Sequence, residues 1–246
     1  MLTSGTTSNN ICTNSMADAA RQTSLDFRGK PTGRGGWRPG AGRPKGRKRP
    51  DHLPRAQFAE RYPVHVTQRL REDVPSIRRE HLVAIVRRAI RAAHRETFRV
   101  VHFVVLSNHL HLIVEAAGAP ALGRGMQGLA IRLARNLNRK LGRKGTFFAE
   151  RYHARVLTNP TQVRNTIRYV LCNARRHDAA ARGSRYWYDP CSSAHWFDGW
   201  KTRLPTGEPW MRALSDERRP TAPAATWLLA TGWRRWGPIG LDEMPA

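Results

Sequence analysis

Acidic residues, cysteine and long hydrophobic runs are all scarce in this sequence. The 246 residues include 18 Asp and Glu against 43 Lys and Arg, which gives a formal net charge of +25 at pH 7. The three cysteines, Cys12, Cys172 and Cys191, are odd in number and lack CxxC spacing. This argues against a disulfide framework or a cysteine-ligated zinc site and fits a reducing cytoplasm.

The longest apolar stretches, near 100–106 and 110–114, are far too short to span a bilayer. We expect no secretory signal, because the N-terminus lacks a basic start followed by an apolar core. A basic amphipathic helix with bulky apolar residues opposite, or a lipidation motif, is also missing, so we expect no membrane partner. A sequence pI near 11.6 instead favours nucleic acid, the commonest cytoplasmic polyanion, and predicts a cytoplasmic, nucleoid-associated protein.

Composition divides the chain into three predicted parts. Residues 28–55 carry ten basic residues and one acid among dense glycine and proline, which cannot hold a helix or a paired strand. We therefore expect a disordered basic arm over 1–57 and a globular catalytic domain over 58–180. Residues 181–246 hold seven of the eight tryptophans with little periodicity, and we expect an irregular C-terminal extension there.

The basic arm contains a Gly42-Arg43-Pro44 core that resembles an AT-hook, an extended segment that lies in the minor groove of DNA. A solvated basic tail that only adds phosphate affinity is the alternative interpretation. In both cases we expect the same cations to contact DNA: Arg43, Lys45, Arg47, Lys48 and Arg49.

Hydrophobic periodicity in the globular part predicts an α+β fold, an antiparallel sheet with helices packed on it. The Thr158-Asn159-Pro160 sequence indicates a helix start, with a capping side chain followed by proline in the first turn. The helix expected at 119–142 carries basic residues off its apolar stripe, and Arg132, Arg135 and Arg139 are candidate DNA contacts. The expected strands are 62–70, 98–106, 109–115 and 147–157, and the expected helices are 75–96, 119–142, 160–177 and a short one at 225–231.

A histidine pair is the clearest chemical signal. His109 and His111 alternate with leucines in Asn108-His109-Leu110-His111-Leu112, and residues i and i+2 of a strand share one face. Two parallel neutral imidazoles can bind one metal ion. The alternative is a pair of exposed or hydrogen-bonded strand histidines. His65 is expected on the same face of the sheet, where a packed or hydrogen-bonded histidine is the favoured interpretation.

The helix at 160–177 supplies a candidate nucleophile. Tyr169 lies well over 90° from the apolar stripe, and Asn173 follows it one turn later on the same face. A surface tyrosine at a domain edge is the alternative. Tyr152 is a rival nucleophile, although it precedes a strand and has no polar partner one turn away. Glu115 and Glu150 are candidate proton acceptors or outer partners of the site.

The tail offers two interpretations. Trp227 and the Trp233-Arg234-Arg235-Trp236 sequence interleave aromatic and basic residues, a pattern that can stack unpaired bases. Anchoring of the tail to the core by its tryptophans is the favoured interpretation.

In this order, the motifs resemble the HUH-type Y1 transposases, the IS200-like group that includes the REP-associated tyrosine transposases. The hairpin HFVVLSNHLHLIVEA (102–116) is similar to the histidine-hydrophobic-histidine strand of that family, and IRYVLCNARRH (167–177) resembles its nucleophile helix. Four further segments are similar to one subgroup: RGMQGLAIRLARNLNRKLG, FAERYHARVL, GGWRPGAGRPKG and SSAHWFDGW.

The resemblance implies an HUH, ferredoxin-like sandwich that cleaves and rejoins single-stranded or hairpin DNA. It implies that Tyr169 forms a 5′-phosphotyrosine while His109, His111 and Asn173 hold a divalent ion, Mg²⁺ or Mn²⁺. Both homodimers and monomers occur in the family, so a homodimer stays open.

Three rival functions remain. A domesticated DNA-binding protein would use the basic arm without transposition. A replication-initiator or relaxase-type nickase would usually carry the histidines in another chain order or include a helicase domain, and no Walker-type GxxxxGK[ST] occurs. An RNA-binding protein is allowed by charge, but the usual RNA-recognition signatures are missing.

Overall fold

The structure, a computed structural model, describes residues 57–177, 187–207 and 209–244. The chain divides into two units, 1–53 and 54–246, and every described residue belongs to the second. Within the described ranges no helix is long and apolar enough to cross a membrane. The cations expected in the basic arm lie outside the described residues: Arg43, Lys45, Arg47, Lys48 and Arg49.

A four-stranded antiparallel sheet forms the centre of the unit, with strand order β2-β3-β1-β4. The strands are β1 (Val64–Arg69), β2 (Phe98–Val105), β3 (His109–Ala116) and β4 (His153–Val156). With α1 (Glu80–Ala93) and α2 (Ala119–Lys140) inserted, the chain order is β-α-β-β-α-β, the arrangement of ferredoxin-like folds. The α+β fold expected from the sequence is confirmed.

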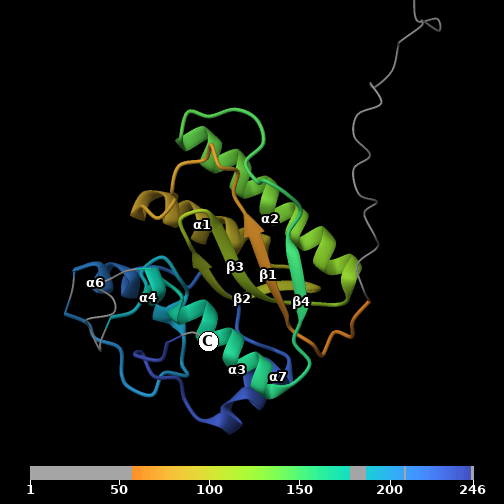
Figure 1. Ribbon diagram of the computed structural model, residues 1–246, viewed down its shortest axis with the longest axis vertical. Coiled ribbons are helices and arrows are strands. Elements are labelled where there is room, and N and C mark those ends of the chain that lie inside the picture. The colour runs from red at the N-terminus through yellow and green to blue at the C-terminus, as the bar shows by residue number, and fades with distance from the viewer. Residues whose placement is uncertain (1–56, 178–186, 208, 245–246) are drawn as a thin grey trace, which may run out of the picture. The chain divides into compact units, whose positions relative to one another are not determined.

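One face of the sheet packs on α1 and α2, which lie together on that side (Figure 1). Alternation places Val64 and Val66 of β1, with Leu110 and Leu112 of β3, in this fully buried core. Helix α2 packs closely on this core: a Cβ atom placed on Gly125 would lie 2.2 Å from the ring of Phe98. The apolar faces of α1 and α2 therefore both pack in this one core.

The opposite face of the sheet is covered by α3 (Pro160–Cys172) and by C-terminal segments, on the far side from α1 and α2 (Figure 1). Val163, Ile167 and Val170 of α3 are fully buried here. Asn159 caps the helix by accepting a hydrogen bond from the Gln162 backbone N–H at 2.9 Å, and Pro160 occupies its first turn. The predicted start of this helix is confirmed.

Two elements differ from their predicted extent. The strand expected at 147–157 is confined to 153–156, because Phe147 turns into the α1/α2 core and Phe148 makes only an isolated bridge with Leu70. The helix expected at 160–177 is interrupted at Asn173 and continues as α4 (Ala174–His177).

The C-terminal extension contains more regular structure than its sequence predicts. A helix near 225–231 was expected, and α7 (Trp227–Ala230) occupies that place. The eight-residue α6 (Pro209–Asp216), which buries Met211 and Leu214, was not expected, because the extension shows little periodicity. The described part of the segment also contains two short 3-10 helices, η1 (Ala194–Trp196) and η2 (Gly232–Trp236).

Residues 191–193 of this extension cover the outer edge of β2. The Val105 N–H donates to the carbonyl of Cys191 at 2.9 Å, and the Ser193 N–H donates to the carbonyl of Phe103 at 2.9 Å. These bonds satisfy backbone groups that an exposed edge strand would leave unpaired.

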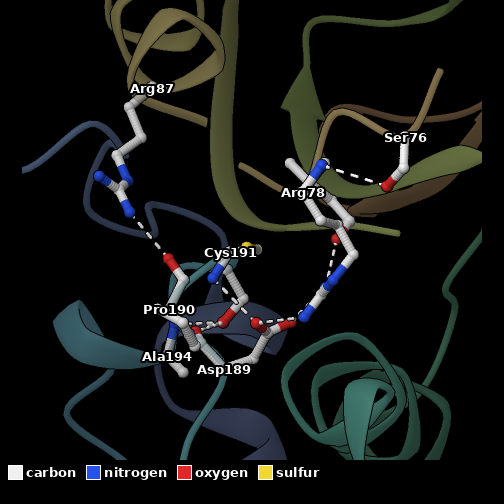
Figure 2. A network of polar contacts seen from close by, with 9 residues as sticks. Ser76, Arg78, Arg87, Asp189, Pro190, Cys191 and Ala194 are labelled. Atoms are coloured by element: carbon white, nitrogen blue, oxygen red, sulfur yellow. Dashed lines mark hydrogen bonds and ion pairs between the residues drawn. The ribbon is translucent and has the colours of Figure 1, made fainter. Parts of the chain in front are cut away.

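A buried carboxylate fixes that segment (Figure 2). Asp189 is fully buried and accepts two hydrogen bonds from the Arg78 guanidinium, each at 3.0 Å, together with one from the Cys191 N–H at 2.9 Å. Arg78 also donates to the carbonyl of Val105 at 2.6 Å, at the end of β2. Nearby, Arg87 donates to the carbonyl of Pro190 at 2.8 Å (Figure 2). The extension is thus attached to the end of β2 that leads into the histidine hairpin.

Candidate active site

The histidines of β3 face α3. Because side chains alternate along a strand, His109 and His111 lie on the face opposite Leu110 and Leu112. Thr67 of β1 pairs directly with His111, so both side chains share the α3 side of the sheet. This places the histidine pair under the helix that carries Tyr169.

The Nε2 atom of His111 has two polar neighbours. The Nε2 atoms of His109 and His111 lie 2.9 Å apart, and the Tyr169 hydroxyl lies 3.3 Å from the same Nε2 of His111. The Tyr169 ring is half-buried and stands edge-on to the imidazole of His111, with the ring centroids 5.0 Å apart. A hydroxyl and two imidazole nitrogens from two elements, 58 residues apart along the chain, therefore converge.

Each histidine of the pair is held by its other ring nitrogen. Asn108 Oδ1 lies 2.6 Å from Nδ1 of His109, and because this oxygen only accepts, His109 donates its Nδ1–H. Nδ1 of His111 contacts Thr67 Oγ1 at 3.1 Å and His65 Nε2 at 3.2 Å. Such contacts fix the orientation and tautomer of an imidazole and leave Nε2 available to a ligand.

Burial keeps the inner histidines neutral. Burial, with the nearby His65 and His109, lowers the pKa of His111 to about 3. Burial, with the Arg155 guanidinium next to it across the strands, lowers the pKa of His65 to about 4. At neutral pH both rings are uncharged, so His111 has a lone pair for a ligand but is a poor proton acceptor.

The two Nε2 atoms fit a shared cation. Two ligands that bind one ion at 2.0–2.1 Å and at a right angle lie about 3 Å apart, close to the distance between these atoms. Within the described ranges, His, Cys, Asp and Glu side chains form no metal-binding group of three or more. His65 contacts the opposite nitrogen of His111 and does not join the pair. Further ligands of such an ion would be oxygen atoms from other groups.

Asn173, the expected third ligand, is buried at 2% exposure and terminates α3 in a helical conformation. It lies one turn after Tyr169, as its spacing predicts. Among the described residues no hydrogen bond joins Asn173 to His109 or His111. The structure therefore brings Tyr169 and the histidine pair into contact and leaves Asn173 outside that set of contacts.

The remaining candidates have other positions. Tyr152 packs against the α1/α2 core, on the other side of the sheet from the histidine pair. Glu115 is buried and accepts hydrogen bonds from the Ala225 N–H and from the N–H and hydroxyl of Thr226, at 2.8–3.1 Å. Glu115 thus anchors the C-terminal extension. Glu150 contacts His153 at 3.2 Å, and both side chains are largely exposed.

Sequence reasoning did not identify Thr67 or the role of Asn108. Thr67 is two residues after His65 on the same strand, so alternation alone could have placed it on the face of the histidines. Its contact with His111 depends on the register between β1 and β3, which the sequence does not show. Asn108 adjoins the histidines and its amide was visible as a potential partner.

Of the tail tryptophans, one anchors the tail to the core and two are exposed, as stacking of unpaired bases would require. Trp233 is 1% exposed and packs in the core beneath α3, as an anchor does. Trp227 and Trp236 are 52% and 62% exposed, and the Arg235 guanidinium lies 5.0 Å from the centre of the Trp227 ring. The extension therefore has both a buried anchor and an exposed aromatic and basic surface.

The candidate DNA-binding arginines of α2 lie in the other layer of the molecule. Arg132 and Arg139 line a furrow between α1 and α2, and Arg135 is exposed but does not line it. The sheet separates all three from Tyr169.

Comparison with known proteins gives limited similarity. No protein-family model matches the chain, and no curated protein matches it. A solved structure of a REP-associated tyrosine transposase bound to a REP hairpin is similar over 50% of this chain and 72% of that one. The identity is 18% and the TM-score is 0.42.

Proposed function

We propose that this protein is a metal-dependent enzyme that cleaves and rejoins single-stranded DNA through a covalent bond to Tyr169, as transposases of the HUH type do. The convergence of the Tyr169 hydroxyl with the Nε2 atoms of His109 and His111 is the observation that carries the proposal. A nucleophile beside two oriented imidazoles suits phosphoryl transfer at a bound cation. The net charge of +25 favours a polyanionic substrate.

In the proposed reaction, the Tyr169 oxygen attacks a phosphorus of the strand. The bond from phosphorus to the 3′ oxygen breaks and a 5′-phosphotyrosine forms. The tyrosine proton is lost to solvent and the 3′ oxygen takes up a proton, so atoms and charge balance. Attack by a 3′-hydroxyl reverses these steps and rejoins DNA without a nucleotide cofactor.

His109 and His111, with Asn173 as the proposed third ligand, would hold Mg²⁺ or Mn²⁺. The ion would polarise the phosphoryl oxygens and stabilise the charge of the transition state. Asn108 and Thr67 orient the two imidazoles, and burial lowers the pKa of His111, so its ring stays uncharged and can bind the ion.

Unpaired DNA also finds suitable groups on this side of the molecule. Arg69 and Arg155 belong to β1 and β4 and pair with His109 and His65, respectively, so they lie on the same face as the site. The exposed Trp227 and Trp236 follow on the extension that packs against α3. Cations with aromatic platforms are the usual components of single-strand binding.

A denaturing-gel assay for protein–DNA adducts tests the proposal. Labelled single-stranded oligonucleotides, including hairpins, are incubated with Mg²⁺ or Mn²⁺ and the full chain. We expect an adduct that requires metal, survives SDS and disappears in Tyr169→Phe. Tyr152→Phe is the matched control, because it removes the same hydroxyl from the opposite face of the sheet, and it should retain the adduct. An adduct that persists in Tyr169→Phe contradicts the assignment.

A DNA-binding protein without chemistry is the second candidate. It is favoured by the cations between α1 and α2, which the sheet separates from Tyr169. Salt-sensitive DNA binding without an adduct on any substrate would support this candidate against the first.

A further inference from the structure

Two cavities follow one another along α2, on the layer opposite the candidate active site: the first lies between α1 and α2, and the second between α2 and the connection from α1 to β2. The first has a volume of about 510 Å³ and the second about 320 Å³, and Arg132 lines both. We call them together the α1/α2 furrow. Its charged lining residues are all basic: Arg88, Arg95, Arg124, Arg132, Arg139 and Lys140.

These six cations are exposed or half-buried, and no described carboxylate lies within ion-pairing distance of any of them. Elsewhere the protein mixes charges. A cavity of about 400 Å³ near Trp227 includes Glu60, Glu96 and Glu115 beside its arginines. Like charges that gather without counter-charges repel one another, so the furrow suits an anionic partner.

The length of the furrow fits an extended polyanion. Arg124 and Arg139 are fifteen residues apart on one continuous helix, which spans about 22 Å at 1.5 Å per residue. At about 3.4 Å of helix axis per base pair, this corresponds to roughly six base pairs of a duplex. Arg88 on α1 and Arg95, two residues after the end of α1, provide the opposite wall.

The lining also indicates which form of nucleic acid binds. Phe98, which contributes to the second cavity, is 1% exposed and offers no ring face to a base. Sites for unpaired strands combine cations with exposed aromatic platforms, whereas a duplex presents mainly its phosphates. The exposed Trp227 and Trp236 are on the extension that covers the other face of the sheet.

We propose that the α1/α2 furrow binds the phosphate backbone of duplex DNA, on the layer opposite Tyr169. The inference rests on the proposed function only in taking DNA as the partner. A substrate with paired and unpaired parts, such as a hairpin, would place its stem here and its unpaired strand on the Tyr169 side. Binding of the stem and cleavage of the strand would then depend on different residues.

The test measures DNA binding by fluorescence anisotropy from 0.05 to 0.3 M salt, using the full chain. The variant carries Arg88→Gln, Arg132→Gln and Arg139→Gln. Its charge-matched control carries Lys201→Gln, Arg203→Gln and Arg212→Gln, three exposed positions outside the furrow. A second furrow variant, with Arg124→Gln in place of Arg132→Gln, changes only exposed side chains and guards against misfolding at the half-buried Arg132.

We expect the furrow variants to bind a 20-base-pair duplex at least tenfold more weakly at 0.1 M salt. The slope of log K against log salt should become less steep by about 2 to 3, since each lost phosphate contact removes about 0.9. The control should change affinity less than threefold. An unstructured oligonucleotide should bind either furrow variant within threefold of the unsubstituted chain.

Equal losses in the furrow variants and the control would overturn the inference, because the net field would then explain binding. An equal loss for the unstructured oligonucleotide would overturn it in favour of a single strand. A preference for duplex RNA over duplex DNA, lost in the furrow variants, would likewise overturn the choice of partner. The adduct assay on an unstructured oligonucleotide reports the proposed function separately, since adduct formation there should not require the furrow cations.

Discussion

His102 should make the protein less stable in acid by an amount that can be measured. The side chain is 5% exposed on β2, its ring meets Phe197 edge-on, and its Nδ1 has no hydrogen-bond partner among the described residues. Burial, together with the nearby Arg219 and against the attraction of Asp198, lowers the pKa of His102 to about 3. In the unfolded chain the same ring titrates near 6.5.

Between pH 6.5 and pH 3 the unfolded chain therefore binds a proton at His102 that the folded chain does not. The free energy of unfolding falls as the pH drops through this window and is unaffected by His102 above it. With 1.36 kcal/mol per pKa unit, the cost at pH 5 is about 2 kcal/mol. This is a substantial part of the stability of an ordinary domain.

The assay is equilibrium unfolding in urea at pH 7.5, 6.0 and 5.0 for the unsubstituted chain and His102→Leu. The substitution alters packing at every pH, so the informative quantity is the change in its effect between pH 7.5 and pH 5. We expect His102→Leu to lose about 2 kcal/mol less stability over that interval than the unsubstituted chain. His81→Leu, at an exposed position on α1, is the matched control and should leave the pH dependence nearly unchanged. Equal pH dependence in His102→Leu and the unsubstituted chain would refute the reasoning.

Three further predictions follow from single contacts. Gly125→Ala should cost about 1–3 kcal/mol of stability in thermal or urea unfolding, because its Cβ meets a buried ring at 2.2 Å, whereas Gly123→Ala, with nothing within 4 Å, should add up to about 1 kcal/mol. Asn108→Ala should weaken Mn²⁺ binding about 10- to 100-fold in calorimetry, because the His109 ring loses its orienting partner, and unchanged affinity would contradict that role. Glu115→Ala should speed proteolytic cleavage in the C-terminal extension while leaving the sheet intact, since it removes the acceptor of four hydrogen bonds.

The elements with strong local signals could be predicted from the sequence. Asn159 and Pro160 indicated the start of α3 because a capping side chain and an N-terminal proline act through their own neighbours. The common face of His109 and His111 followed from strand alternation alone. Only the sheet register brings Thr67 to His111, and this register is a property of two strands together.

The features that the sequence did not predict depend on contacts between residues far apart in the chain. Glu115 looked like a candidate for the chemistry because it is close to the histidines in sequence. Its backbone partners at 225–226 are 110 residues away, and they bind it as an anchor for the extension. The same limit applies to α6, whose short amphipathic sequence gains its meaning only from the surface on which it packs.

The C-terminal extension also determines where the candidate nucleophile lies, which its irregular sequence did not indicate. Arg164, five residues before Tyr169 on α3, donates to the carbonyls of Gly237 and Pro238 and makes two hydrogen bonds to Glu243 at 3.0 and 3.2 Å. The carboxylate of Glu243 is held in its charged form, since these arginine contacts outweigh burial and lower its pKa. These bonds hold one end of α3 against the extension, while the buried stripe of the helix holds it against the sheet. The 3.3 Å separation between Tyr169 and His111 is therefore a joint product of the sheet, the helix and the extension.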